Sequence, residues 1–145
     1  MTYLYGLIGA VAFIVALLLS VVLHEAGHLL TAKRFGMKAS QFFAGFGATL
    51  WSTRRGETEY GIKAIPLGGF VKIVGYTSLE KIDPADEPRA FYRQPAPRRA
   101  AVIVAGVVMN LLLAFLLLIG LAAGVGIPSG NAATTVVRRV SPCVT

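Results

Sequence analysis

The stretch Ser20-Val-Val-Leu-His24-Glu25-Ala-Gly-His28-Leu-Leu-Thr-Ala32 decides the fold, because it places three ionisable side chains at the end of a long apolar run. We predict that residues 3–35 form one helix, which Gly36 ends. Positions i and i+4 share one face of a helix, so the imidazoles of His24 and His28 can reach a single ion. Glu25 points to the side of this pair, where it can act on a water instead of binding the metal.

This H-E-x-x-H spacing is typical of zinc proteases. Here the motif lies within the inner part of a membrane segment, where ionisable groups are costly and indicate a functional site. The alternative is a membrane histidine that a neighbouring helix satisfies, which explains one such residue more readily than three at this spacing.

Two segments are long and apolar enough to cross a bilayer. Apolar residues make up 55% of the chain and charged residues only 14%. The runs Leu4–Leu23 and Ala100–Ile127 carry no charge, and each reaches the roughly 20 residues that a membrane helix needs. A cleaved signal peptide is the alternative for the first run, but no basic region precedes it and the run is too long. We predict an α-helical membrane protein with two transmembrane helices and a cytoplasmic, membrane-associated β-hairpin region between them.

The basic residues predict the orientation in the cell membrane. The formal net charge is +7, and most of the 14 Lys and Arg residues lie between Lys33 and Arg99. By the positive-inside rule the loop 36–99 is cytoplasmic, and the N-terminus and the C-terminal tail are extracytoplasmic. Contact with anionic lipid headgroups explains these charges better than nucleic acid does. No nucleotide-binding motif is present, so the bilayer is the partner that the composition favours.

The region 38–76 has the pattern of short strands separated by glycines. Residues 49–53 and 57–65 flank Arg54-Arg55-Gly56, which predicts a hairpin turn. Two glycine clusters lie around these strands, Gly45-Phe46-Gly47 and Gly68-Gly69-Phe70. Ordinary turns explain most such clusters. The other interpretation is that a backbone with few side chains lets a second chain pair with it by β-addition.

The rest of the chain is a connecting loop, a second span and a polar tail. The proline-rich loop covers residues 77–99, and the second helix is expected over 100–127. In that span Asn110 either bonds to a neighbouring helix or lies near the metal site and holds substrate backbone. Residues 130–145 resemble the start of a further domain, so we expect a piece of a longer protein. Cys143 is the only cysteine, which is compatible with a free thiol or an absent partner.

These residues together resemble the N-terminal part of a site-2 protease, the family of intramembrane zinc metalloproteases. The similarity is greatest to the bacterial, PDZ-containing, actinobacterial type, which acts in regulated intramembrane proteolysis of anti-sigma-factor-type proteins. Five stretches carry it in family order: His24-Glu-Ala-Gly-His28, Phe43-Ala-Gly-Phe-Gly47, Trp51-Ser-Thr-Arg-Arg-Gly-Glu-Thr-Glu-Tyr-Gly61, Ile65-Pro-Leu-Gly-Gly-Phe70 and Ala105-Gly-Val-Val-Met-Asn110.

The resemblance implies a role for each matching position. His24 and His28 would be ligands of Zn²⁺, and Glu25 would be the catalytic base. The hairpin region, with its two glycine clusters, would present a single-span membrane substrate in extended form, and Asn110 would contact that substrate. Thr134–Val140 would be the first strand of the PDZ domain.

Two departures from the family pattern bear on these roles. Val107 stands where the family usually has proline. This departure changes none of the predicted zinc ligands. The family's third zinc ligand is an aspartate on a later transmembrane helix, and neither Asp83 nor Asp86 lies in a matching motif. We therefore expect residues 1–145 to be inactive alone. The alternative function is a non-catalytic metal-binding membrane protein or scaffold, in which an acid beside the first histidine has no purpose.

Overall fold

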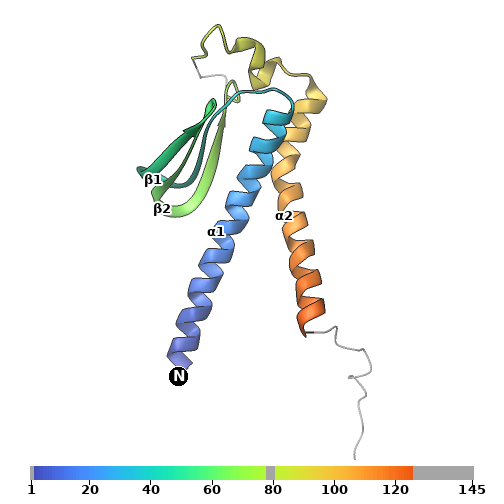
Figure 1. Ribbon diagram of the computed structural model, residues 1–145. Helices are drawn as coiled ribbons and strands as arrows, with labels where there is room; N and C mark the ends of the chain where they lie inside the picture. Colours follow the sequence, from blue (N-terminus) through green and yellow to red (C-terminus); the bar gives the residue numbers. More distant parts are fainter. Residues whose placement is uncertain (1, 78–80, 126–145) are drawn as a thin grey trace, which may run out of the picture. The chain divides into compact units, whose positions relative to one another are not determined.

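Two long helices with a β-hairpin between them make up most of the protein (Figure 1). The structure, a computed structural model, describes residues 2–77 and 81–125. The elements are helix α1 (Thr2–Arg34), strand β1 (Ala39–Arg55), strand β2 (Thr58–Ile73), the 3-10 helices η1 (Glu87–Arg89) and η2 (Phe91–Arg93), and helix α2 (Ala96–Val125). The predicted fold class is confirmed in its two apolar helices and the hairpin. The predicted start of a PDZ domain at 130–145 and Cys143 lie outside the described residues.

Both helices are long and apolar enough to cross a membrane. The segments Tyr3–Arg34 and Ala96–Gly124 each have a mean hydropathy of 2.9. Every side chain from residue 3 to residue 17 is exposed, and most of them are large and apolar. Exposure of so large an apolar surface to water is unfavourable, whereas its exposure to the hydrocarbon of a membrane is favourable. Residues 1–114 form one compact unit; from Phe115 the chain belongs to a second unit, whose described part continues α2 to Val125.

Helix α1 ends where Gly36 adopts a left-handed conformation, with φ of 75°. The amide of Gly36 donates to the carbonyl of Lys33, and the amide of Met37 donates to the carbonyl of Ala32, both at 3.0 Å. This pair of bonds is a Schellman motif, and glycine adopts the required φ without strain. Met37 and Ala32 are both fully buried. The motif therefore turns the chain from α1 directly into β1.

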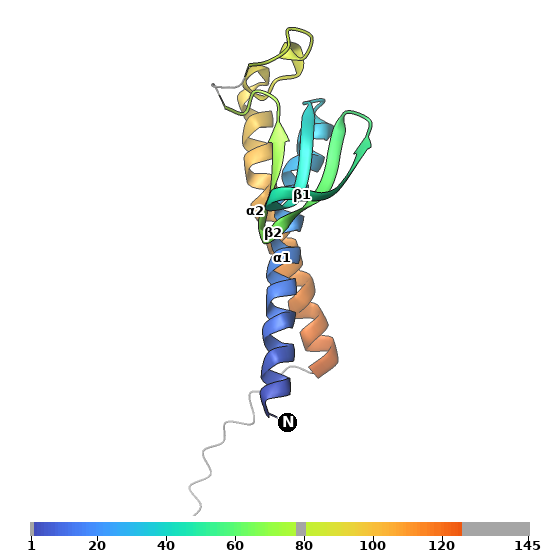
Figure 2. The same cartoon turned by 90° about the vertical axis from the view of Figure 1, so that its left-hand side faces the viewer.

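The hairpin has an irregular register, because both strands bend. Residues 49–55 of β1 pair with residues 58–63 of β2, whereas residues 39–44 of β1 pair with residues 69–73. Phe42, Phe43 and Ala44 have a second partner each, in residues 60–62 of β2. The start of β1 thus lies inside the sheet, and residues 69–73 lie at its edge (Figure 2).

The core joins the inner ends of the helices to the base of the hairpin. It contains Leu29 and Ala32 of α1, Ala39 of β1 and Ile73 of β2, with Phe91 of η2 and Val102 of α2 packed among them. The hairpin lies beside α1 on the side away from the first part of α2 (Figures 1 and 2). This core is the apolar contact that fixes the hairpin against α1 at the level of the H-E-x-x-H motif.

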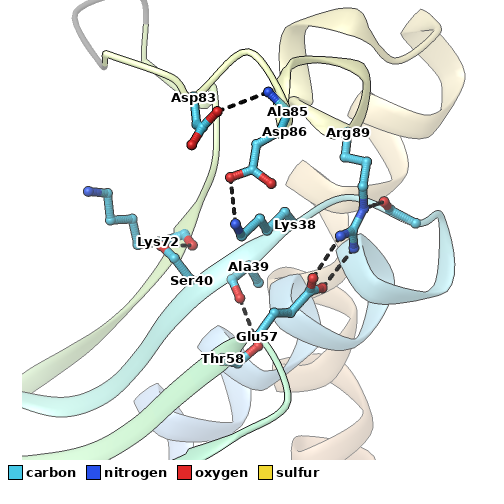
Figure 3. Close-up of polar contacts among 11 residues, drawn as sticks. Lys38, Ala39, Ser40, Glu57, Thr58, Lys72, Asp83, Ala85, Asp86 and Arg89 are labelled. Atoms are coloured by element: carbon cyan, nitrogen blue, oxygen red, sulfur yellow. Dashed lines mark hydrogen bonds and ion pairs between the residues drawn. The ribbon is translucent and has the colours of Figure 1, made fainter.

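Polar contacts fasten the connecting loop to the hairpin turn (Figure 3). Arg89 donates to both carboxylate oxygens of Glu57 at 2.7 Å, and its Nε donates to the carbonyl of Gly36 at 3.0 Å. Lys38 pairs with Asp86, and the buried hydroxyl of Thr58 donates to the carbonyl of Ala39 at 2.7 Å. The hydrogen bond from the Arg89 guanidinium holds the pKa of Glu57 below its usual value of 4.5, and the positive charge adds to this effect.

We predict that Glu57→Gln lowers the free energy of unfolding by about 1 kcal/mol at neutral pH, because both side chains of the pair are partly exposed and screened by solvent. Since the pKa of Glu57 is lowered, the pair contributes fully above pH 4.5 and loses its contribution as the pH falls through the lowered value. Unfolding curves in detergent at several pH values measure this.

The matched control is Glu59→Gln on β2, two residues after Glu57, whose carboxylate accepts a hydrogen bond from Gln41 at 3.4 Å and forms no bidentate pair with an arginine in the described part of the chain. A stability difference between wild type and Glu57→Gln that stayed constant down to the acid unfolding range would contradict the assignment.

Candidate metal centre

His24 and His28 are adjacent on the face of α1 that packs against α2. Their ring centroids are 4.9 Å apart, and the rings stand nearly perpendicular, at 79°. Both residues are half-buried. The i, i+4 spacing on a regular helix explains this proximity, as the sequence predicts.

The Nδ1 atom of His28 has a fixed partner. It lies 2.6 Å from the carbonyl oxygen of Val102, a buried residue of α2. A carbonyl can only accept, so Nδ1 carries the proton and donates it. The lone pair of His28 is therefore on Nε2, the state in which an imidazole binds a metal. Metal-binding histidines are commonly oriented in this way by a backbone carbonyl.

Gly106 of α2 packs directly against both rings. A Cβ atom on this residue would lie 2.5 Å from Nε2 of His24 and 2.5 Å from Nε2 of His28. Both potential ligand atoms thus lie close together against the backbone of a glycine. Zinc binds histidine nitrogen at about 2.0–2.1 Å, so two neighbouring Nε2 atoms can share one ion, and a methyl group on Gly106 would displace the rings that hold it. The histidine pair and Gly106 fit a zinc ion.

The Nδ1 atom of His24 faces the side-chain amide of Asn110, which comes from α2 one turn beyond Gly106. The amide nitrogen lies 3.2 Å from Nδ1, and the hydroxyl of Ser20 donates to the amide oxygen at 3.5 Å. Asn110 therefore both bonds to the neighbouring helix and lies at the metal site. The sequence left these two interpretations as alternatives.

Glu25 faces the hairpin. Its carboxylate accepts a hydrogen bond from the backbone amide of Val71 at 3.1 Å, at the edge of the sheet formed by β2. A Cβ on Gly69 would lie 3.5 Å from Cγ of Glu25 and 3.0 Å from the carbonyl oxygen of Phe43. Glu25, which the sequence predicts to be the catalytic base, thus lies between α1 and the edge of β2.

The other predicted substrate-binding residues lie along the hairpin, and within residues 2–77 and 81–125 they form no hydrogen bond or ring contact with the histidines. Gly45, Gly47 and Gly68 have positive φ values of 89°, 84° and 127° where the strands bend. Phe70 stacks on Phe43 and Phe46, with centroid distances of 5.6 and 6.2 Å. Of the two glycine clusters, the second is therefore the one that reaches the ionisable site, through Gly69.

Within the described ranges 2–77 and 81–125, no three His, Cys, Asp or Glu side chains group together as a metal site would require. Asp86 pairs with Lys38, and Asp83 accepts a hydrogen bond from the amide of Ala85 at 3.0 Å. Both aspartates lie in the connecting loop beside the hairpin base (Figure 3).

The sequence analysis assigned no role at the site to three residues that contact the histidines or Asn110: Ser20, Val102 and Gly106. Their spacing along the helices could have indicated them. Ser20, His24 and His28 are spaced by four residues on α1, and Val102, Gly106 and Asn110 are spaced by four on α2. Two matching stripes on antiparallel helices predict contact pairs, but only the packing of the helices establishes their register.

The sequence model described as Peptidase family M50 matches residues 12–144. The chain belongs to this family. It is 49% identical over 136 residues to the zinc metalloprotease Rip1 of Mycobacterium tuberculosis, which covers 94% of this chain and 34% of the relative. It is also 49% identical over 141 residues to the zinc metalloprotease Rip1 of Mycolicibacterium smegmatis, covering 94% of this chain and 35% of the relative.

The family supports the predicted resemblance to site-2 proteases and, with the two apolar helices, a membrane location. The names of the relatives support zinc as the metal and peptide hydrolysis as the reaction class. The chain spans about a third of the length of the relatives it matches. The remaining site assignments stay predictions from the sequence and the geometry.

We predict that Gly106→Ala lowers the zinc affinity of the full-length protein by at least about tenfold, because the new methyl group would lie 2.5 Å from both Nε2 atoms. Competition with a chelator of known affinity measures it. Gly120→Ala is the matched control, since a Cβ there meets nothing within 4 Å. Equal zinc affinity in Gly106→Ala and wild type would rule out this position for the metal.

Proposed function

We propose that the protein is a zinc endopeptidase that hydrolyses peptide bonds of transmembrane substrates within or beside the membrane. One observation carries the proposal: two histidine nitrogens lie close together, and the acid next to the first of them contacts the edge strand of the hairpin. A metal, a base and a surface for extended peptide are the parts that such a reaction needs.

Glu25 is the general base in this proposal. Zinc, when bound, polarises the scissile carbonyl and makes water acidic enough to lose a proton near neutral pH. The Glu25 carboxylate accepts that proton and passes it to the leaving amine. Its hydrogen bond from Val71 orients the carboxylate, and the remaining lone pairs are free to accept.

The edge of β2 at residues 69–71, beside Glu25, is the proposed substrate strand site. A transmembrane substrate must lose its helix before hydrolysis, because a helix engages its carbonyls in its own hydrogen bonds. At membrane depth the released backbone groups need new partners. The edge supplies them beside Glu25, and Gly69 keeps side-chain bulk away from the approaching chain.

The substrate class follows from the resemblance to regulators of sigma-factor proteolysis. We propose single-span membrane proteins of the anti-sigma-factor type as substrates. The positive-inside rule places the hairpin and the connecting loop on the cytoplasmic side, with both ends of the chain outside.

The alternative is a non-catalytic metal-binding membrane protein. The observation in its favour is the bond between Glu25 and Val71, which gives this acid a structural role in holding the hairpin to α1. Substitution by glutamine separates the two functions, because an amide oxygen still accepts from Val71 but an amide takes no proton from water.

We therefore predict that Glu25→Gln in the full-length protein, in membranes, lowers cleavage of a single-span substrate by about 10²–10⁴-fold. Zinc content and thermal stability should stay at the wild-type level. Glu59→Gln serves as the control for loss of a hairpin carboxylate. Cleavage that survives Glu25→Gln would favour the metal-binding alternative.

The third zinc ligand is proposed to come from a part of the protein beyond this chain. Catalytic zinc normally takes three protein ligands, and His24 and His28 provide two. We predict that residues 1–145, produced alone, bind zinc weakly and cleave nothing measurable. A chelator titration that found tight, stoichiometric zinc on this piece would contradict the prediction.

A further inference from the structure

We propose that Asn110 is the positioning residue that selects the metal-binding tautomer of His24. The inference rests on the proposed zinc site and assigns Asn110 to the metal rather than to the substrate. It is carried by the chain of contacts from Ser20 through the Asn110 amide to the imidazole.

The tautomer of His24 depends on which end of the amide faces it. With the amide nitrogen 3.2 Å from Nδ1, Asn110 donates and Nδ1 accepts, which places the imidazole proton on Nε2. A zinc ion shared with His28 requires the lone pair on Nε2, because the Nε2 atoms of both histidines lie together at Gly106. The proton must then be on Nδ1, and Nδ1–H needs an acceptor.

Rotation of the Asn110 amide by half a turn supplies that acceptor without moving either helix. The carboxamide oxygen then accepts from Nδ1–H of His24, and the amide nitrogen donates to the hydroxyl of Ser20. Ser20 suits both orientations, because a hydroxyl both donates and accepts. The same three groups thus satisfy His24 in both tautomers.

The two ligands differ in what orients them. The tautomer of His28 is fixed by the backbone carbonyl of Val102, which no substitution removes. That of His24 depends on a side chain alone. An amide also performs this role without charge, whereas a carboxylate inside the bilayer core would cost free energy when the metal is absent.

Both ends of the Asn110 amide are engaged on α1, so its contacts point to the metal ligand and not to a substrate chain. Loss of an outer partner of a metal-binding histidine typically weakens metal affinity by about 10–100-fold. Loss of a substrate contact would raise KM and leave metal affinity unchanged. The two roles therefore separate in a binding measurement that needs no substrate.

The experiment measures the zinc affinity of the full-length protein in detergent by chelator competition, for wild type, Asn110→Leu and Asn110→Asp. Leucine has nearly the same size but no acceptor, and aspartate keeps an oxygen for Nδ1–H. We expect a loss of about 10–100-fold for Asn110→Leu and an affinity within about threefold of wild type for Asn110→Asp. Leu111→Ala, at an exposed neighbouring position, is the control and should match wild type.

Wild-type affinity in Asn110→Leu, with a raised KM for substrate, would overturn the proposal and return Asn110 to substrate binding. Equal losses in Asn110→Leu and Asn110→Asp would also overturn it, since they would indicate packing alone. If Asn110→Leu does not fold, Ser20→Ala decides: a severalfold loss supports the proposal, and wild-type affinity opposes it. Absence of zinc binding in wild type would instead refute the proposed function.

Discussion

The close approach of α1 and α2 is the constraint on which the site depends. It is made possible by one glycine on each helix. A Cβ on Gly27 would lie 2.6 Å from the carbonyl oxygen of Ala105, just as a Cβ on Gly106 would collide with both imidazoles. In lipid, helices gain little from burying apolar side chains against each other, so small residues that allow close backbone packing decide where they meet. This contact brings the two histidines within reach of backbone and side-chain partners on α2.

Because α1 and α2 run antiparallel, residues spaced by four on one helix contact residues spaced by four on the other. Ser20 meets Asn110, and His28 meets Val102, while Gly106 lies between the two histidines. Each helix contributes residues at a spacing of four, so all the groups lie on facing stripes. The Nδ1 atoms are directed to polar partners, and the Nε2 atoms face the glycine. One packing geometry thereby orients both histidines and brings their Nε2 atoms close together.

The hairpin contributes a backbone hydrogen bond to the H-E-x-x-H segment of α1. Because β1 pairs with β2 on both of its sides, the edge at residues 69–73 is the part turned to α1. Glu25 accepts a hydrogen bond from the Val71 amide of that edge and so links the strand to α1. The Glu57–Arg89 pair and the buried Thr58 hydroxyl fasten the other end of the hairpin, near the end of α1.

The sequence by itself determined the features that depend on neighbouring residues. Charge-free runs predicted both apolar helices, Gly36 predicted the end of α1, and the i, i+4 spacing placed His24 and His28 on one face. Only the tertiary structure decided what these residues touch. Asn110 lies 86 residues from His24 in sequence, Val102 lies 74 from His28, and Val71 lies 46 from Glu25. Such pairs depend on helix register and on strand bends, which follow from close packing at glycines and which no local pattern encodes.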